Sequence, residues 1–88
     1  MKITIVGTGY VGLITGVCLA SKGHKVIAVD INKKIVKSIN KSKPHFHEKG
    51  LPELLKEVIS NKRFSASTSL EKALNLSEVV IIAVGTPS

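Results

Sequence analysis

Three glycines near the N-terminus have a spacing suited to binding phosphate groups. Gly7, Gly9 and Gly12 form a G-x-G-x-x-G pattern directly after the β-branched run Lys2–Val6. The first glycine permits a tight turn, the second lets the backbone approach a pyrophosphate, and the third lets the next helix pack close to the strand. The free N–H groups of the first helical turn, around residues 10–12, would then face the phosphates with the positive end of the helix dipole.

A carboxylate completes this pattern. Asp30 lies 18 residues after Gly12, at the end of a second β-branched run, Lys25–Val29. An aspartate in this position accepts hydrogen bonds from the adenosine ribose of a dinucleotide. Its charge also repels the additional 2′-phosphate of NADP. The sequence therefore predicts a dinucleotide site that prefers NAD over NADP.

Other side chains with possible chemistry give weaker signals. Cys18 lies on the apolar side of the first predicted helix, where we interpret it as a small buried hydrophobe without a disulfide partner. His45 and His47 have a spacing compatible with metal binding, but no second ligand cluster accompanies them, so no metal site is predicted. The pair Lys33–Lys34 is interpreted as part of an exposed helix face.

The segments around these residues alternate between strands and helices. Strands are predicted over Lys2–Val6, Lys25–Val29, Arg63–Ser67 and Glu78–Val84, and helices over residues 10–22, 32–41, 51–61 and 68–74, with a loop over 42–50. This alternation is typical of a parallel sheet with crossover helices, and continuous apolar strands fit a sheet covered on both faces. The predicted fold class is α/β: an incomplete Rossmann-type sheet of four parallel strands in the order 3-2-1-4.

Composition narrows the possible classes further. The chain has 88 residues, and a net charge of +7 arises from 13 Lys and Arg against 6 Asp and Glu. That charge suggests nucleic-acid binding, but one Tyr and two Phe give no stacking platform, so this function is not favoured. The longest apolar run, Val79–Val84, is far shorter than the roughly 20 residues of a membrane-spanning helix. We expect no secretory leader, and we expect the protein to be cytoplasmic.

Four segments together resemble the N-terminal part of the UDP-glucose/GDP-mannose dehydrogenase family. These segments are Gly7–Leu13 (GTGYVGL), Gly23–Asp30 (GHKVIAVD), Ile39–Asn40 followed by Glu48–Leu51 (EKGL), and Ala83–Pro87 (AVGTP). Each segment alone is a weak signal. Their order and spacing resemble the family over essentially the whole chain.

The resemblance implies cofactor contacts at Tyr10, Val11, Asp30 and Thr86, together with Gly85 and the glycines of the loop. It implies an enzyme that oxidises the C6 alcohol of a nucleotide sugar, UDP-glucose or a near relative, to a carboxylate with two NAD. The family's cysteine nucleophile and its lysine, asparagine and aspartate helpers lie beyond the part that this chain resembles. We therefore expect residues 1–88 to be the N-terminal part of an NAD-binding domain, without the substrate domain, without catalytic residues and without activity by itself.

Two alternatives stay open at this point. One is a stand-alone NAD-binding or regulatory module without catalysis, which a measurable NAD affinity and a stable monomeric fold would favour. The other is a basic interaction domain, for example for RNA, which salt-dependent binding without any effect of NAD would favour. In addition, the apolar strand Glu78–Val84 is expected at an open edge of the sheet, so self-association through this strand is predicted.

Overall fold

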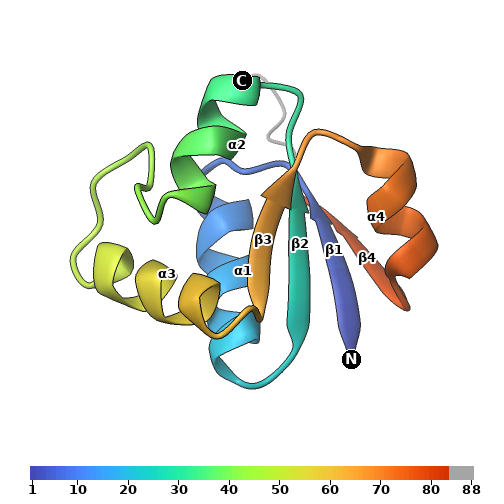
Figure 1. The fold of residues 1–88 in the computed structure, drawn as a ribbon, viewed down its shortest axis with the longest axis horizontal. Coiled ribbons are helices and arrows are strands. Elements are labelled where there is room, and N and C mark those ends of the chain that lie inside the picture. The colour runs from blue at the N-terminus through green and yellow to red at the C-terminus, as the bar shows by residue number, and fades with distance from the viewer. Residues whose placement is uncertain (84–88) are drawn as a thin grey trace.

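Four parallel strands form one sheet, and the direction in which successive strands are added to it reverses once along the chain. The computed structural model describes residues 1–83. The sheet has the order β3-β2-β1-β4 (Figure 1), formed by β1 (Lys2–Val6), β2 (Lys25–Val29), β3 (Phe64–Ser67) and β4 (Val79–Ile82). Within it, Ile5 of β1 lies opposite Ala28 of β2 and opposite Ile81 of β4. The predicted fold class and strand order are confirmed.

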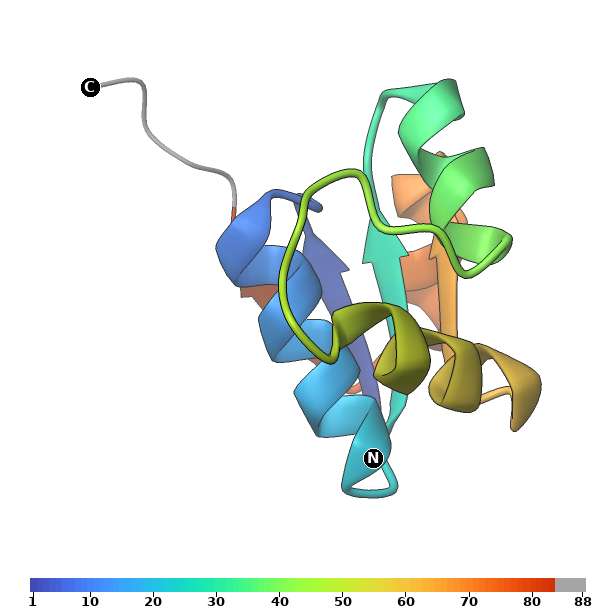
Figure 2. The ribbon, with the colours of Figure 1, turned by 90° about the vertical axis from the view of Figure 1, so that its left-hand side faces the viewer.

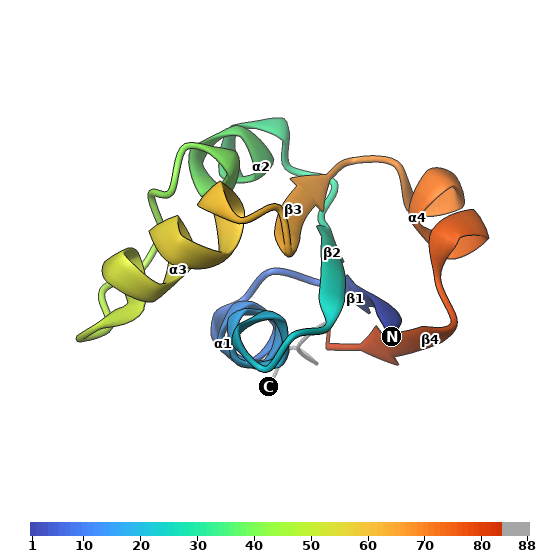
Figure 3. The ribbon, with the colours of Figure 1, turned by 60° about the horizontal axis from the view of Figure 1, so that its bottom comes forward.

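Helices cover the two faces of the sheet unequally. One face carries α1 (Tyr10–Ser21), α2 (Lys33–Asn40) and α3 (Leu51–Ser60), whereas α4 (Leu70–Leu76) lies alone on the other (Figure 3). Crossovers between parallel strands are right-handed, so helices change face when the strand order changes direction. The steps from β1 to β2 to β3 run one way, and the step from β3 to β4 runs back across β2 and β1. None of the helices within residues 1–83 is long and apolar enough to cross a membrane.

The core lies between the sheet and the three helices α1, α2 and α3. Ile5, Leu13, Ile39 and Leu55 are among its fully buried side chains. Gly16 permits the close approach of α1, because a Cβ atom there would lie 2.9 Å from the Phe64 ring and 3.0 Å from Ile5 Cδ1. The absence of a side chain at this position thus sets the distance between α1 and the sheet.

On the other face, a hydroxyl cluster joins α4 to the middle of the sheet. The buried Thr4 hydroxyl lies within hydrogen-bond distance of both the Ala73 carbonyl oxygen, at 3.1 Å, and the Ser77 hydroxyl. Ser77 Oγ donates to the same carbonyl at 2.5 Å. These bonds satisfy a polar side chain that the apolar surroundings of β1 would otherwise leave without a partner.

The predicted boundaries agree with the observed ones to within a few residues. Gly23 follows α1 with a positive φ of 102°, and Ser69 caps α4 by accepting from the Lys72 N–H at 3.3 Å. Asn32 caps α2 through its side chain, which was not predicted. The fourth strand is shorter than predicted, and Val84 lies outside the described residues.

The prediction for Cys18 is wrong, because this side chain is exposed. The residues of α1 are apolar on nearly all sides, so their sequence does not show which side is covered. The covered side carries Leu13, Gly16, Val17 and Ala20. At about 100° per residue, Cys18 lies nearly opposite the middle of that side, so its side chain faces solvent.

The two edge strands, β3 and β4, differ in whether a side chain pairs with their outward backbone groups. At the β3 edge, the side chain of Asn40 donates to the Ala66 carbonyl oxygen and accepts from the Ala66 N–H, both at 2.9 Å. This pair of bonds replaces those of a neighbouring strand. At the β4 edge no group within residues 1–83 plays this part, and Ile82 is 66% exposed.

Asn40→Ala is expected to lower the free energy of unfolding by about 1–3 kcal/mol, because both backbone groups of Ala66 lose a part-buried partner. Urea denaturation measures this loss. The matched control is Asn61→Ala, which removes one exposed bond to the Arg63 N–H. Equal losses in the two variants would contradict a special role of Asn40 at the edge.

Candidate functional site

The turn after β1 has a conformation that requires glycine. Gly7 has a φ of 107°, in the region that side chains disfavour. Its N–H donates to the Val29 carbonyl oxygen at 2.8 Å, which ties the turn to the end of β2. The turn and the end of β2 are therefore held together at the carboxyl edge of the sheet, where ligands bind in open α/β folds.

The two later glycines of the pattern have different surroundings. A Cβ atom on Gly12 would lie 2.1 Å from the Gly7 carbonyl oxygen, so the protein itself requires glycine there. A Cβ atom on Gly9 would meet no described atom within 4 Å, and its φ of −68° is ordinary. The fold therefore gives no reason for a glycine at position 9, and the space in front of it is open to a ligand.

The first turn of α1 faces this open space. Gly9 is the residue that precedes the helix, and no side chain of the described residues caps it. The first backbone bond of the helix runs from the Leu13 N–H to the Gly9 carbonyl oxygen at 2.9 Å. The N–H groups of Tyr10, Val11 and Gly12 precede this bond, and such groups at a helix start are suited to an anion.

Asp30 lies beside the glycine turn and is held by three hydrogen bonds. Its Oδ2 accepts from the Thr8 hydroxyl at 2.6 Å and from the Thr8 N–H at 3.3 Å. Its Oδ1 accepts from the Asn32 N–H at 2.9 Å. The carboxylate at the end of β2 is thus fixed to the turn after β1, although the two segments are distant in sequence.

These contacts keep the Asp30 carboxyl ionised. Partial burial by itself raises its pKa, but the Thr8 hydroxyl, the N–H groups of Asn32 and Thr8 and the charge of His45 outweigh that effect. The pKa of Asp30 therefore lies below its usual value. Since the charged form is favoured in the folded protein, its stabilising effect is present above the ordinary carboxyl pKa and is lost as the pH falls through the lowered value.

A mainly apolar hollow of about 220 Å³ lies next to Asp30. It is lined by the ends of β1 and β2 with the residues that follow them, and by the segment that leads into α4, through Val6, Gly7, Val29, Asp30, Ile31, Thr68 and Leu70. Ile31 is 94% exposed, which is unusual for such an apolar side chain. An apolar hollow with one carboxylate at its border is suited to a flat heterocycle attached to a sugar.

The loop over residues 42–50 passes close to the start of α1 (Figure 2). Tyr10 donates a hydrogen bond from its hydroxyl to Glu48 Oε2 at 2.8 Å, and its ring packs on Phe46 with 5.3 Å between the ring centroids. The hydrogen bond to Glu48, the charge of Glu48 and desolvation raise the pKa of Tyr10. This loop therefore lies beside the residue that follows Gly9, and the Tyr10 side chain is directed toward the loop.

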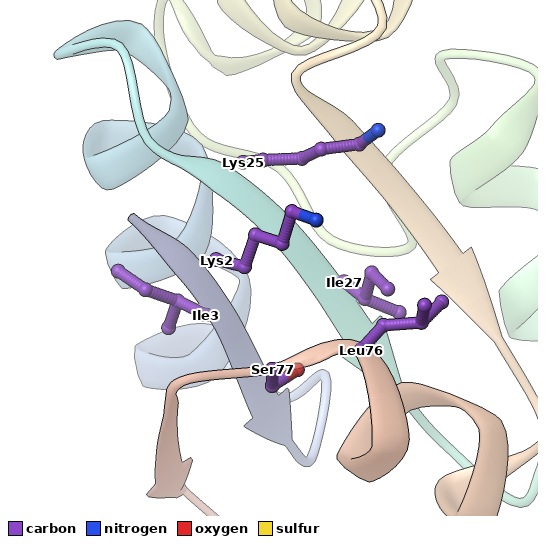
Figure 4. A pocket seen from close by; sticks show the side chains of 6 residues that line it. All are labelled: Lys2, Ile3, Lys25, Ile27, Leu76 and Ser77. Atoms are coloured by element: carbon purple, nitrogen blue, oxygen red, sulfur yellow. The ribbon is translucent and has the colours of Figure 1, made fainter.

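Other hollows are less suited to a dinucleotide. The one in Figure 4 lies at the amino ends of β1 and β2, near Lys2, Lys25 and Leu76, and holds only about 60 Å³. A groove of about 350 Å³ between α1 and α3 has Tyr10 and Cys18 on its border. The first lies at the opposite edge of the sheet from Asp30, and the second extends from Tyr10 along α1 away from Asp30.

The basic residues after Asp30 lie on the surface. Lys33 and Lys34 are exposed, as predicted, and Lys34 borders an open hollow formed with Lys37, Lys41 and Lys43. No group of three or more metal-binding side chains is present within residues 1–83.

The structure thus brings together Gly7, Gly9, Tyr10, Val11, Gly12 and Asp30 at one edge of the sheet. Gly85 and Thr86 lie outside the described residues. Sequence reasoning missed Thr8, Ile31 and Leu70. For Ile31 a signal existed, because an apolar residue directly after a strand-ending aspartate has no buried strand position to occupy. No sequence signal indicated the hydrogen bond between Thr8 and Asp30.

Comparisons with known proteins agree with this geometry. The family model described as "UDP-glucose/GDP-mannose dehydrogenase family, NAD binding domain" matches residues 1–88. The chain is 42% identical to a UDP-glucose 6-dehydrogenase of Bacillus subtilis over 87 residues, which are 99% of this chain and 20% of that protein. It is also 42% identical to a GDP-mannose 6-dehydrogenase of Pseudomonas putida over 88 residues, which are 100% of this chain and 20% of that protein.

A solved structure shows the same arrangement of elements. The crystal structure of a ternary complex of GDP-mannose dehydrogenase from Pseudomonas aeruginosa matches with a TM-score of 0.97 and 42% identity, covering 100% of this chain and 20% of that one. The chain therefore spans about a fifth of the length of the relatives that it matches.

Proposed function

Because the chain belongs to the UDP-glucose/GDP-mannose dehydrogenase family and matches its NAD-binding domain, we propose that NAD binds at the carboxyl ends of β1 and β2. The observation that carries this proposal is the open space at Gly9 next to the ionised carboxylate of Asp30. The pyrophosphate lies over Gly9 at the start of α1, and the adenosine ribose donates to Asp30. The adenine occupies the hollow beside Ile31 and Leu70.

The other proposed contacts surround this position. Gly7 and Gly12 shape the turn, and the N–H groups of Tyr10 and Val11 approach the phosphates. Gly85 and Thr86 are proposed as contacts from the segment that follows β4. In this scheme the chain's own residues bind and orient the cofactor.

The activity proposed for the protein as a whole is that of its relatives. NAD supplies a hydride acceptor, and the substrate class is a nucleotide sugar oxidised at C6 from an alcohol to a carboxylate. The UDP-glucose and GDP-mannose enzymes match with the same 42% identity, so the proposal names the class rather than one sugar. Residues 1–88 by themselves are proposed as the N-terminal part of the NAD-binding domain, which binds the cofactor without catalysing the oxidation.

The unmodified chain is expected to bind NAD weakly, with a Kd on the order of 1 mM, because it carries only part of the relatives' length. Gly9→Val is expected to abolish binding, since its side chain enters the open space, where a Cβ atom meets no described atom within 4 Å. Chemical-shift changes during an NMR titration measure both affinities.

Cys18→Val is the matched control for Gly9→Val. It adds a similar side chain to an exposed position of the same helix, away from the turn. Its NAD affinity should equal that of the unmodified chain. Unchanged NAD shifts in Gly9→Val would show that the pyrophosphate does not lie at this turn.

The chain is also expected to prefer NAD over NADP, because the ionised Asp30 repels a 2′-phosphate. Asp30→Ser removes this charge while Lys33 and Lys34 remain, so it should narrow the difference between the two cofactors. Parallel titrations with NAD and NADP provide the measurement. Equal affinities in the unmodified chain would contradict the assignment of Asp30 to the ribose.

Self-association through β4 is the second part of the proposal. Val80 and Ile82 are exposed, and the outer edge of β4 has no partner strand within residues 1–83. An unpaired apolar edge is a template for pairing with another chain. Burial of about 400 Å² of apolar surface contributes roughly 10 kcal/mol before the costs of association, whereas salt screens the repulsion between the positive chains beyond about 8 Å. The simplest product is a two-fold dimer with antiparallel β4 strands.

Ile82→Lys is expected to shift this dimer toward monomer at millimolar concentration, because it places a charge on the exposed edge. Sedimentation measures the change. Ser65→Lys is the matched control, since it adds the same charge at an exposed position of the other edge strand, where Asn40 occupies the edge. A monodisperse monomer of the unmodified chain at this concentration would refute the edge pairing.

A further inference from the structure

The residue that holds Asp30 is itself outside the proposed ligand contacts. Thr8 is 1% exposed, so its side chain lies beneath the surface of the glycine turn. Its hydroxyl donates to Asp30 Oδ2 at 2.6 Å, and its N–H reaches the same oxygen at 3.3 Å. A hydroxyl donor at this distance from a carboxylate makes a short, charge-assisted bond.

The bonds around Asp30 use its two oxygens unequally. A carboxylate oxygen has two acceptor positions. On Oδ2 both are occupied, by the two donors of Thr8, whereas Oδ1 accepts only from the Asn32 N–H. Within the described residues, the acceptor position left for a ribose hydroxyl is therefore on Oδ1.

We propose that Thr8 is a positioning residue for cofactor selection, which holds the Asp30 carboxylate in the one orientation that presents a free acceptor to the ribose. This inference rests on the proposed function and deepens it. Without the Thr8 hydroxyl, the carboxylate keeps the Asn32 N–H bond at 2.9 Å and only the long Thr8 N–H bond at 3.3 Å on Oδ2, so it can rotate away from the ribose. The same rotation moves its charge away from a 2′-phosphate, so both NAD affinity and discrimination against NADP depend on the Thr8 hydroxyl.

Two substitutions at Thr8 separate the effect of its hydroxyl from that of its methyl group. Thr8→Val removes the hydroxyl and keeps the branched shape, and the N–H bond remains. Thr8→Ser keeps the hydroxyl and removes the methyl group. If the packing of the Thr8 side chain were what mattered, Thr8→Ser, which deletes the methyl group, would change NAD affinity and selectivity as Thr8→Val does.

The first measurement is the relative affinity for NAD and NADP, taken from the initial slopes of chemical-shift change at the Asn32 and Leu13 amides. Thr8→Val is expected to bind NAD about tenfold more weakly, the loss typical of a hydrogen bond to a charged group. Its preference for NAD over NADP should shrink toward that of Asp30→Ser. Thr8→Ser should retain both properties. Thermal unfolding establishes that each variant is folded.

The second measurement is the pH titration of the Asp30 carboxyl without cofactor, followed by carbon NMR. Loss of the Thr8 hydroxyl should raise the pKa of Asp30, because a bond to the charged form is removed, and Thr8→Ser should not. His45 also acts on Asp30, and Lys33 and Lys34 begin the next helix. The side chains around the hollow from β1, from α4 and from the segment before α4 are Val6, Leu70 and Thr68, which carry no charge. The same charged groups are present in all variants.

The outcomes separate the two proposals. If the unmodified chain binds NAD and Thr8→Val keeps its NAD affinity and selectivity, the role of Thr8 is refuted and the proposed function stands. If Thr8→Ser loses selectivity as Thr8→Val does, the effect belongs to packing and the positioning role is also refuted. If the unmodified chain does not bind NAD, the proposed function fails and this inference fails with it.

Discussion

The close contact between α1 and the turn after β1 is the constraint on which the rest of the structure depends. Gly12 lies so near the Gly7 carbonyl that any side chain would force the two apart. Gly16 allows the same close approach one turn later, against Ile5 and Phe64. Because α1 lies this near the sheet, its first turn stands directly over the carboxyl end of β1. The anion-binding end of the helix and the end of β2 therefore face one ligand.

The reversal of strand order has consequences for both faces of the sheet. Right-handed crossovers place three helices on one face and leave α4 alone on the other. The face with three helices supplies most of the buried core, whereas α4 buries only Ala73 among its residues. Thr68 before α4 and Leu70 at its start instead line the hollow beside Asp30, so the face with fewer buried side chains borders the proposed adenine position.

The outward N–H and C=O groups of the two edge strands have different surroundings. A single side chain, Asn40, completes the ladder at β3 with two hydrogen bonds to Ala66. The β4 edge has apolar, exposed side chains instead and suits another strand. A second copy of the chain is the partner proposed for this edge.

The sequence by itself determined the strand order, the helix that follows the glycine turn, and the place of Asp30. These features depend on local patterns: the period of the apolar residues, the glycine that stops α1 at Gly23, and the spacing of the G-x-G-x-x-G pattern. Only the tertiary structure decided that Cys18 is exposed, that Asn40 completes β3, and that Thr8 holds Asp30 across 22 positions of sequence. The physical reason is that these contacts join segments from different elements. Which sides of two elements meet depends on their packing, and a pattern within one segment carries no information about its partner.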